Sequence, residues 1–496
     1  MALIPLQLPA GIYRNGTEFQ SAGRWRDSNL VRWIDNTMQP IKGWAERTTD
    51  QADAPLRGSI AWRDNLGNRY LAAGNASQLV TYLDDGTLVD ITPTGLTSGS
   101  VDATENNGFG GYLFGRGYYG TERPDTTSFN PATTWALDTW GEYLVACSDA
   151  DGKIYEWQLD RGTPTVAAQI TNAPTGNRSI VTTDERFIFA LGAGGDPRKV
   201  QWCDREDNTT WTPLATNEAG DIILQTFGDI ECGHRVQGQT IILTTQDAHT
   251  ATYIGGQFVY SFERVGTNCG IMGKKAATTV QGTCFWMGKR GFFMYQGGAV
   301  KEIQSEVDDY VFSNINRNSG SKVAAVVNSQ YNEVWWFYPS DEATENDSYV
   351  VYNYLENFWY VGHMGRTTGV DHGIYRNPIY FCAATNRPFD HETGYDYHNL
   401  DMPWAESGAI TLGNGDNVMV ITEMIPDELT QGDVRFQFKS RFYPNGDEYI
   451  SEWYDAGAPT SVRVTGRQIR IRVEGVRLSD WRVGTNRIEV KAGGKR

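Results

Sequence analysis

Four of the six histidines lie close together in the sequence, with carboxylates beside them. Histidine and carboxylate side chains that converge in space can bind a metal ion or transfer protons. These histidines are 7 to 19 residues apart across loop-like sequence, a spacing that fits no compact metal motif. Ordinary hydrogen-bonded histidines are the simpler interpretation, so we predict no metal site and no cofactor. The residues are His363, His372, His391 and His398, with Asp371, Asp390 and Glu392 nearby.

Other kinds of catalysis have recognisable spacings. The sequence contains no P-loop, dinucleotide fingerprint, GxSxG elbow or HExxH helix. Asp149-Ala150-Asp151-Gly152 occurs once, and a type I′ hairpin turn accounts for it. The 60 acidic residues leave a glycosidase carboxylate pair open, but no pattern selects one. We therefore predict that the protein is not an enzyme.

The cysteines and the apolar runs indicate the setting in which the chain folds. No two of the six cysteines form a CxxC pair, which favours free, mostly buried thiols made in a reducing cytoplasm over disulfides or a zinc site. No apolar run approaches the roughly 20 residues of a membrane helix. The opening residues lack the pattern of a secretory signal. The cysteines are Cys147, Cys203, Cys232, Cys269, Cys284 and Cys382.

Charge is unevenly distributed along the 496 residues. The formal net charge is −17, yet positions 460–496 carry +7, which leaves −24 on the first 459 residues. Tight binding to phosphates needs an extended basic surface, so the composition argues against a nucleic-acid clamp. The basic C-terminal segment is a local feature of an acidic protein.

The elements that would position any site are short strands. Between Lys322 and Gly362, apolar and aromatic residues occur in four runs separated by Asn, Pro, Asp and Gly, without helical periodicity. A four-stranded meander of about 40 residues is the size of one β-propeller blade. The expected strands are Val323–Val327, Val334–Tyr338, Tyr349–Tyr354 and Phe358–Val361.

Similar units recur between residues 58 and 400. We therefore predict an all-β protein with a β-propeller of six or seven blades. The last blade could take a strand from the N-terminal region, and an array of β-sandwiches is the alternative fold. The predicted units are Gly58–Thr92, Thr134–Leu159, Arg178–Trp211, Ile222–Phe262, Lys274–Ile303, Lys322–Gly362 and Thr367–Tyr397.

One insertion interrupts the repeats at 93–131. Glycine alternates there with aromatic residues, Tyr118 and Tyr119 among them, and such a composition cannot bury an ordinary core. We interpret this segment as a projection used in assembly, with the two tyrosines at the contact.

Residues 1–57 are predicted to form an N-terminal arm that packs outside the propeller. Trp25, Trp33 and Trp44 occur among arginines, a composition typical of interface anchors. We therefore place these three tryptophans at a subunit contact. The alternative is an N-terminal strand pair that packs on its own domain.

Residues 401–496 are predicted to form a C-terminal domain resembling a β-sandwich. In the run 467–473, Ile469, Ile471 and Val473 alternate with Arg470 and Arg472, which indicates a half-buried strand. We expect the two arginines to face outward and to meet an acidic partner. A solvated strand face is the simpler alternative.

The order of these motifs carries a resemblance that runs nearly end to end. The chain resembles the tail nozzle or hub proteins of short-tailed bacteriophages, also called tubular tail protein B or DNA-stabilisation tail proteins. The resemblance rests on Gly23–Asp27 with Asn29–Trp33 and Pro40–Trp44, on the Gly/Tyr insertion, on Asn332–Pro339, on His391–Tyr395, and on Asp480–Thr485 followed by Ala492–Gly494.

The resemblance implies a structural protein of the virion tail, made in the host cytoplasm. It implies a homohexameric ring below the portal and adaptor proteins, near the tail fibres, that retains packaged DNA and releases it at infection. An acidic channel would let DNA pass without binding. The alternative is a receptor- or glycan-binding propeller of a tail fibre or another surface adhesin, in which Trp335 and Trp336 would stack on sugars.

Overall fold

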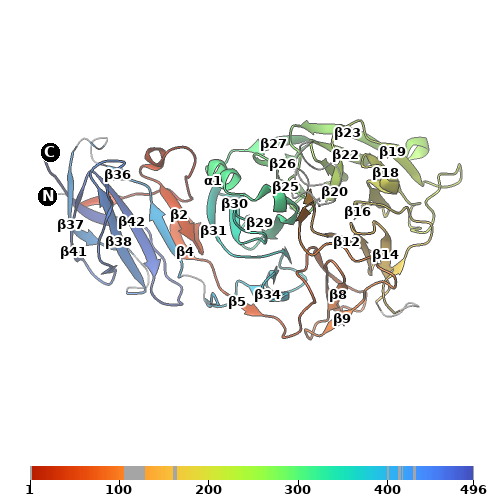
Figure 1. Ribbon diagram of the computed structural model, residues 1–496, viewed down its shortest axis with the longest axis horizontal. Helices are drawn as coiled ribbons and strands as arrows, with labels where there is room; N and C mark the ends of the chain where they lie inside the picture. The colour runs from red at the N-terminus through yellow and green to blue at the C-terminus, as the bar shows by residue number, and fades with distance from the viewer. Residues whose placement is uncertain are drawn as a thin grey trace, which may run out of the picture.

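The computed structural model describes residues 3–105, 129–159, 165–398, 402–411, 415, 417–427 and 432–494. The molecule is elongated, with a β-propeller at one end and a two-sheet β unit at the other (Figure 1). β1 and β43, the first and last strands described, pair with each other in that second unit. The all-β prediction is confirmed.

Seven four-stranded antiparallel sheets form the blades of the propeller. Blade 1 holds β6 (Ser59–Arg63), β7 (Arg69–Gly74), β8 (Leu79–Tyr82) and β9 (Leu88–Asp90); blade 2 holds β12 (Trp135–Trp140), β13 (Tyr143–Ser148), β14 (Ile154–Trp157) and β15 (Ala168–Gln169); blade 3 holds β16 (Ser179–Thr182), β17 (Ile188–Leu191), β18 (Lys199–Trp202) and β19 (Gly220–Ile223). Blade 4 holds β20 (Ile230–Val236), β21 (Gln239–Thr244), β22 (Asp247–Tyr253) and β23 (Tyr260–Thr267); blade 5 holds β24 (Ala277–Val280), β25 (Thr283–Met287), β26 (Phe292–Gln296) and β27 (Ala299–Ile303); blade 6 holds β28 (Ala324–Asn328), β29 (Glu333–Tyr338), β30 (Ser348–Asn353) and β31 (Phe358–His363).

Blade 7 is completed by a strand from far away in the sequence. It contains β32 (Thr368–Val370), β33 (Ile379–Cys382), β34 (Arg387–His391) and, as its outermost strand, β5 (Trp44–Glu46). β34 pairs antiparallel with β5, with His391 opposite Trp44. The prediction that an N-terminal strand completes the last blade is therefore confirmed. The first strands of the seven blades contact one another in a closed circle around the propeller axis.

Aromatic packing holds neighbouring blades together. Trp336 of β29 is fully buried, donates its indole N–H to the carbonyl oxygen of Ala276 at 3.0 Å, and packs on Phe292 of blade 5. Blades 1 and 2 meet where a Cβ on Gly74 would lie 2.4 Å from the Trp135 ring. Glycine is required at that position because any side chain would displace the tryptophan.

The C-terminal unit consists of two sheets, which we call the sandwich. One sheet has the order β1 (Leu3–Leu6), β43 (Asn486–Ala492), β37 (Met419–Ile425) and β41 (Thr460–Gly466). The other has the order β2 (Trp25–Asn29), β35 (Trp404–Ser407), β42 (Gln468–Gly475), β38 (Val434–Arg441) and β39 (Tyr449–Ile450), with β36 (Ile410–Thr411) on β42 and β40 (Tyr454–Asp455) on β38. Both ends of the chain therefore contribute strands to it.

Residues of the predicted arm are shared between the two units. β1 and β2 lie in the sandwich, and β5 lies in blade 7. Between them, β3 (Val31–Ile34) and β4 (Thr37–Pro40) form a hairpin, and Met38 exchanges backbone hydrogen bonds of 2.9 Å with Val483. The hairpin β3–β4 lies outside the propeller, and β2 contacts β31 of blade 6 (Figure 1).

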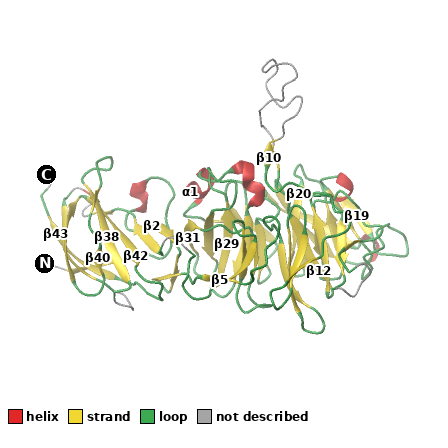
Figure 2. Ribbon diagram, turned by 60° about the horizontal axis from the view of Figure 1, so that its bottom comes forward, coloured by secondary structure: helices red, strands yellow, loops and turns green. Residues whose placement is uncertain are grey.

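The remaining elements are short. The insertion at 93–131 is described only at its base, where β10 (Thr104–Glu105) pairs with β11 (Phe129–Asn130) (Figure 2). No helix in the described ranges is long and apolar enough to cross a membrane. The short helices are α1 (Asp308–Ser313) and the 3-10 helices Glu18–Ser21, Ala193–Gly195, Gly256–Phe258 and Arg317–Lys322.

Candidate functional site

The three tryptophans predicted as interface anchors are buried inside the chain. Trp25, Trp33 and Trp44 are 5%, 2% and 4% exposed. The Trp25 and Trp33 rings are neighbours, and Trp33 also contacts Tyr360 of blade 6. Side chains this deeply buried cannot anchor a neighbouring subunit without rearrangement. The prediction of an exposed tryptophan cluster is therefore wrong, and the alternative, packing on the same chain, is what the structure has.

Burial also removes the sugar platforms that the glycan-binding alternative required. Trp335 and Trp336 are 2% and 0% exposed, because β29 is an interior strand of blade 6. The Trp335 indole donates to Glu333 at 2.9 Å. Both side chains belong to the core of the propeller.

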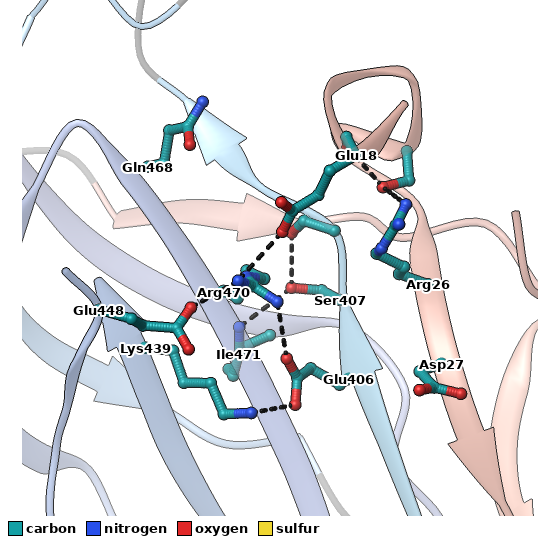
Figure 3. A network of polar contacts seen from close by, with 12 residues as sticks. Glu18, Arg26, Asp27, Glu406, Ser407, Lys439, Glu448, Gln468, Arg470 and Ile471 are labelled. Carbon is teal, nitrogen blue, oxygen red and sulfur yellow. Dashed lines mark hydrogen bonds and ion pairs between the residues drawn. The ribbon is translucent and has the colours of Figure 1, made fainter. Parts of the chain in front are cut away.

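Arg470 and Arg472 lie on the outward face of β42, as their alternation with the buried Ile469, Ile471 and Val473 predicted. Both arginines nevertheless form ion pairs with carboxylates of the same chain. Arg470 lies 3.0 Å from Glu18, 3.2 Å from Glu406 and 2.5 Å from Glu448 (Figure 3). Arg472 pairs with Glu474 at 2.9 Å and stacks over the Trp404 ring at 3.9 Å.

We call the group around Arg470 the ionic junction, because it joins the 3-10 helix at Glu18–Ser21 to the sandwich. Lys439 donates to Glu406 at 2.6 Å, and Arg441 donates to Glu18 at 2.8 Å. Burial alone would raise the pKa of Glu18, but the hydrogen bond from Arg441 and the charge of Arg470 hold it below its usual value. Carboxylates of the same chain thus pair with Arg470, and the predicted contact of these arginines with a partner ring stays a prediction.

A second ion group fixes the hairpin β3–β4 to the propeller. Arg32 is 1% exposed and donates to both carboxylate oxygens of Glu392, at 2.9 and 2.6 Å, and to Glu333 at 3.1 Å. Its guanidinium also lies 3.7 Å from the centre of the Tyr331 ring. Burial raises the pKa of Glu333 to about 7; the charge of Arg32 opposes this shift and the charge of Glu392 adds to it.

The base of the insertion is held by a buried lysine. The Lys322 ammonium is 2.5 Å from Asp102, just before β10, and 2.7 Å from Glu345, and it is almost fully buried. Arg57, also buried, binds the same Glu345. The insertion therefore starts from a rigid base, whereas Tyr118 and Tyr119 lie outside the described residues and their predicted contact stays a prediction.

The propeller axis contains a cavity of about 290 Å³, which we call the axial pocket. Its walls come from the first strands of blades 1 to 5, whose backbones lie around the axis. The polar and charged side chains that line it are Thr134, Asp138, Ser179, His234, Arg235, Lys274, Lys275 and Thr279.

Most charges of the axial pocket are paired. Arg235 lies 3.0 Å from Asp138, which also accepts the backbone N–H of Thr182 at 2.8 Å. Lys274 lies 2.7 Å from Asp149. The side chain of Lys275 has neither a hydrogen bond nor an ion pair to the described part of the chain.

Burial changes the protonation behaviour of two groups there. It lowers the pKa of His234 to about 4, with help from the charges of Lys275 and Arg235, so this histidine is neutral at pH 7. Burial also lowers the pKa of Lys275 to about 8. The pocket thus combines a neutral imidazole, two paired cations and one unpaired amine.

The clustered histidines do not converge on a common point. His391 accepts from Arg366 at 2.9 Å, and His398 contacts the carbonyl oxygen of Trp44 at 2.7 Å. His363 contacts Ser348, and His372 contacts Asp371. Among the described residues, no group of three or more histidine, cysteine, aspartate or glutamate side chains is placed to hold a metal ion.

The acidic turn at 149–152 joins β13 to β14, as a hairpin turn should. A type I′ turn requires positive φ at both central residues, whereas only Gly152 has a positive φ here, of 61°. The predicted turn type is therefore wrong. The Asp149 carboxylate accepts hydrogen bonds from the backbone N–H and the hydroxyl of Thr134, and it pairs with Lys274 at the axial pocket.

Sequence reasoning missed the axial pocket and both ion groups. The residues of the axial pocket come from five separate blades, and no local spacing in the sequence links them. One signal was present: Lys274 and Lys275 are adjacent cations directly before a predicted strand, and cations drawn into a fold need anions from elsewhere in it.

No protein-family model matches this sequence, and comparison with curated proteins also returns no match. Among solved structures, virginiamycin B lyase from Staphylococcus aureus is similar over 70% of this chain and 97% of its own, with 7% identity and a TM-score of 0.44. The N-terminal domain of Nup159 is similar over 74% of this chain and 98% of its own, with 8% identity and a TM-score of 0.35. At such low similarity, the fold assignment rests on the seven blades of this chain.

Proposed function

We propose that this protein is a non-catalytic structural subunit of a bacteriophage tail, a nozzle or hub that assembles as a homohexameric ring below the portal and adaptor. In this proposal the ring retains the genome and releases it at infection, and DNA passes without specific binding. The end-to-end sequence resemblance supports the family. The observation that carries an assembly role is an exposed apolar hairpin in the sandwich.

That hairpin joins β38 to β39 at the edge of the larger sheet. Four large apolar side chains, two directly after β38 and two on β39, are about half to two-thirds exposed: Phe442, Tyr443, Tyr449 and Ile450. Aromatic groups on an exposed sheet edge are typical of protein contacts and are a liability when nothing covers them. In the proposed ring, a neighbouring copy of the chain covers them.

The rigid construction of the subunit supports the same proposal. Strands from both chain ends build the sandwich, β5 closes the propeller, and two ion groups fasten the segment between them. A ring that holds back packaged DNA needs subunits that transmit force between their contacts without unfolding locally. The interleaved strands favour this, because the N-terminal segment cannot detach without breaking strand pairs in blade 7 and in the sandwich.

Assembly can be tested with the purified full-length chain. Light scattering after size exclusion, and negative-stain electron microscopy, should detect six-fold rings, either alone or with the portal and adaptor proteins of the same genome. Tyr449→Ser with Ile450→Ser should abolish the rings and leave a folded monomer. Leu66→Ser, on a propeller turn and 77% exposed, is the matched control and should assemble normally.

Two results would overturn the proposal. A chain that stays monomeric with the portal and adaptor complex present does not form the ring. A wild-type chain that binds host-surface glycans in an array, while ignoring that complex, would instead favour the receptor-binding alternative.

A further inference from the structure

One charged group in the propeller core is left without a protein partner. Lys275 precedes β24 and lines the axial pocket, and it is half-buried. The neighbouring Lys274 binds Asp149 at 2.7 Å, and Arg235 binds Asp138 at 3.0 Å. In the described chain, no acceptor lies within hydrogen-bonding distance of the Lys275 ammonium. A charge held in a partly desolvated site without a partner is costly, so it indicates a missing anion.

The other groups facing Lys275 leave an excess of positive charge. Arg235, Lys274 and Lys275 line the pocket with a single lining carboxylate, Asp138, and His234 is neutral at pH 7. Asp149, which also acts on Lys275, is already bound by Lys274 and Thr134. Asp138 and Asp149 are therefore paired with other groups, and the Lys275 ammonium keeps its N–H donors free for a ligand.

The hydroxyl groups and the volume of the axial pocket indicate which kind of ligand would fit it. Ser179 and Thr279 line the same cavity and can donate to oxygen atoms of a ligand, whereas the Thr134 hydroxyl already donates to Asp149. A volume of about 290 Å³ lies at the small end of ligand-binding pockets. Such a cavity suits a compact ligand rich in oxygen atoms and excludes a polymer chain.

We propose that the axial pocket is a binding site for a small oxyanion, a phosphate or a compact carboxylate, with the Lys275 ammonium as its principal ion-pairing group. Arg235 and Lys274 raise the local potential while remaining tied to their own carboxylates. The site lies within one propeller, so it does not depend on ring assembly or on the function proposed above.

The test uses the full-length protein at pH 7 and measures its thermal midpoint and isothermal titration heats. Sodium phosphate and sodium malonate are titrated separately against sodium chloride of equal ionic strength. We expect saturable stabilisation by at least one oxyanion that chloride does not reproduce. Phosphate alone would define a phosphate site, malonate alone a carboxylate site, and both together a general oxyanion site.

Lys275→Met should weaken oxyanion binding at least tenfold, whereas Lys275→Arg should retain it because the positive charge remains. Lys301→Met removes an exposed lysine on β27 and should leave the affinity unchanged. The thermal midpoint of Lys275→Met without ligand confirms folding and should not fall, since the variant loses a poorly solvated charge. Equal stabilisation of wild type and Lys275→Met, or no effect of either oxyanion beyond chloride, overturns the proposal.

Discussion

The contacts between propeller blades and the contacts that fasten the N-terminal segment depend on different forces. Neighbouring blades join through buried aromatic rings, such as Trp336 on Phe292, in contacts that depend little on salt or pH. The N-terminal segment is fastened to the sandwich by the ionic junction around Arg470 and to the propeller by the Arg32 group. These contacts bury charges whose stability depends on complete pairing. The aromatic contacts between blades should therefore respond little to ionic conditions, whereas the ionic junction and the Arg32 group should respond to them.

The two regions also differ in how the chain builds them. Blades 1 to 6 each use one contiguous segment, whereas blade 7 and both sheets of the sandwich need strands from the first 46 residues. Breaking the N-terminal connection should consequently affect both regions, while damage to one blade should act mainly through its own core. The following substitutions test this difference, from the largest expected effect to the smallest.

Trp336→Ala should produce the largest loss of stability. It removes a fully buried indole, its hydrogen bond to Ala276 and its packing on Phe292, and should cost about 3–5 kcal/mol in the free energy of unfolding. Guanidinium denaturation followed by circular dichroism measures the change. Leu355→Ala, 71% exposed in the same blade, should stay within about 0.5 kcal/mol. Similar losses for both variants would contradict the aromatic account.

Arg32→Met should cost about 3 kcal/mol at pH 8, because Glu333 and Glu392 are left as buried, unpaired carboxylates. The loss should shrink at pH 5, where protonation removes the uncompensated charge. In the wild type, the raised pKa of Glu333 makes its protonation stabilising: that contribution is fully present below about 4.5 and is lost as the pH rises through about 7.

Denaturation midpoints at pH 5 and pH 8 measure this dependence. Adding Glu333→Gln to Arg32→Met removes one of the two orphaned charges and should recover part of the stability at pH 8. An Arg32→Met variant that is equally destabilised at both pH values would mean that lost packing, and not charge, dominates at this position.

The sequence predicted the blades well and the connections poorly, for a physical reason. Within a blade, pairing is local, so runs such as Val334–Tyr338 and turn residues such as Asp84–Gly86 define strands directly. The tryptophans of the first 57 residues could not be placed, because burial depends on strands hundreds of positions away. Arg470 was placed on the correct face, but its partner Glu18 is 452 residues distant in the sequence and no pattern connects them.

Arg470→Met should cost about 1–3 kcal/mol at low salt, less than a core tryptophan, since Glu406 keeps Lys439 and Glu18 keeps Arg441. The effect should diminish in 1 M sodium chloride through screening. Because the pKa of Glu18 is lowered in the folded state, its share is present above about 4.5 and is lost as the pH falls through the folded value. Arg477→Met, 75% exposed in its side chain, is the control and should change little.

The smallest effect is expected at an ion pair on the surface of the propeller. Arg69 and Asp84 lie 2.9 Å apart on blade 1, but their side chains are 37% and 51% exposed. A double-mutant cycle with Arg69→Ala and Asp84→Ala should give a coupling of about 0.2–1 kcal/mol, because water screens the pair and both side chains lose rotational freedom. Denaturation midpoints of the four proteins measure it. A coupling as large as the Arg470 effect would mean that charge pairs hold the propeller as strongly as they hold the junction, and the contrast between the two regions would fail.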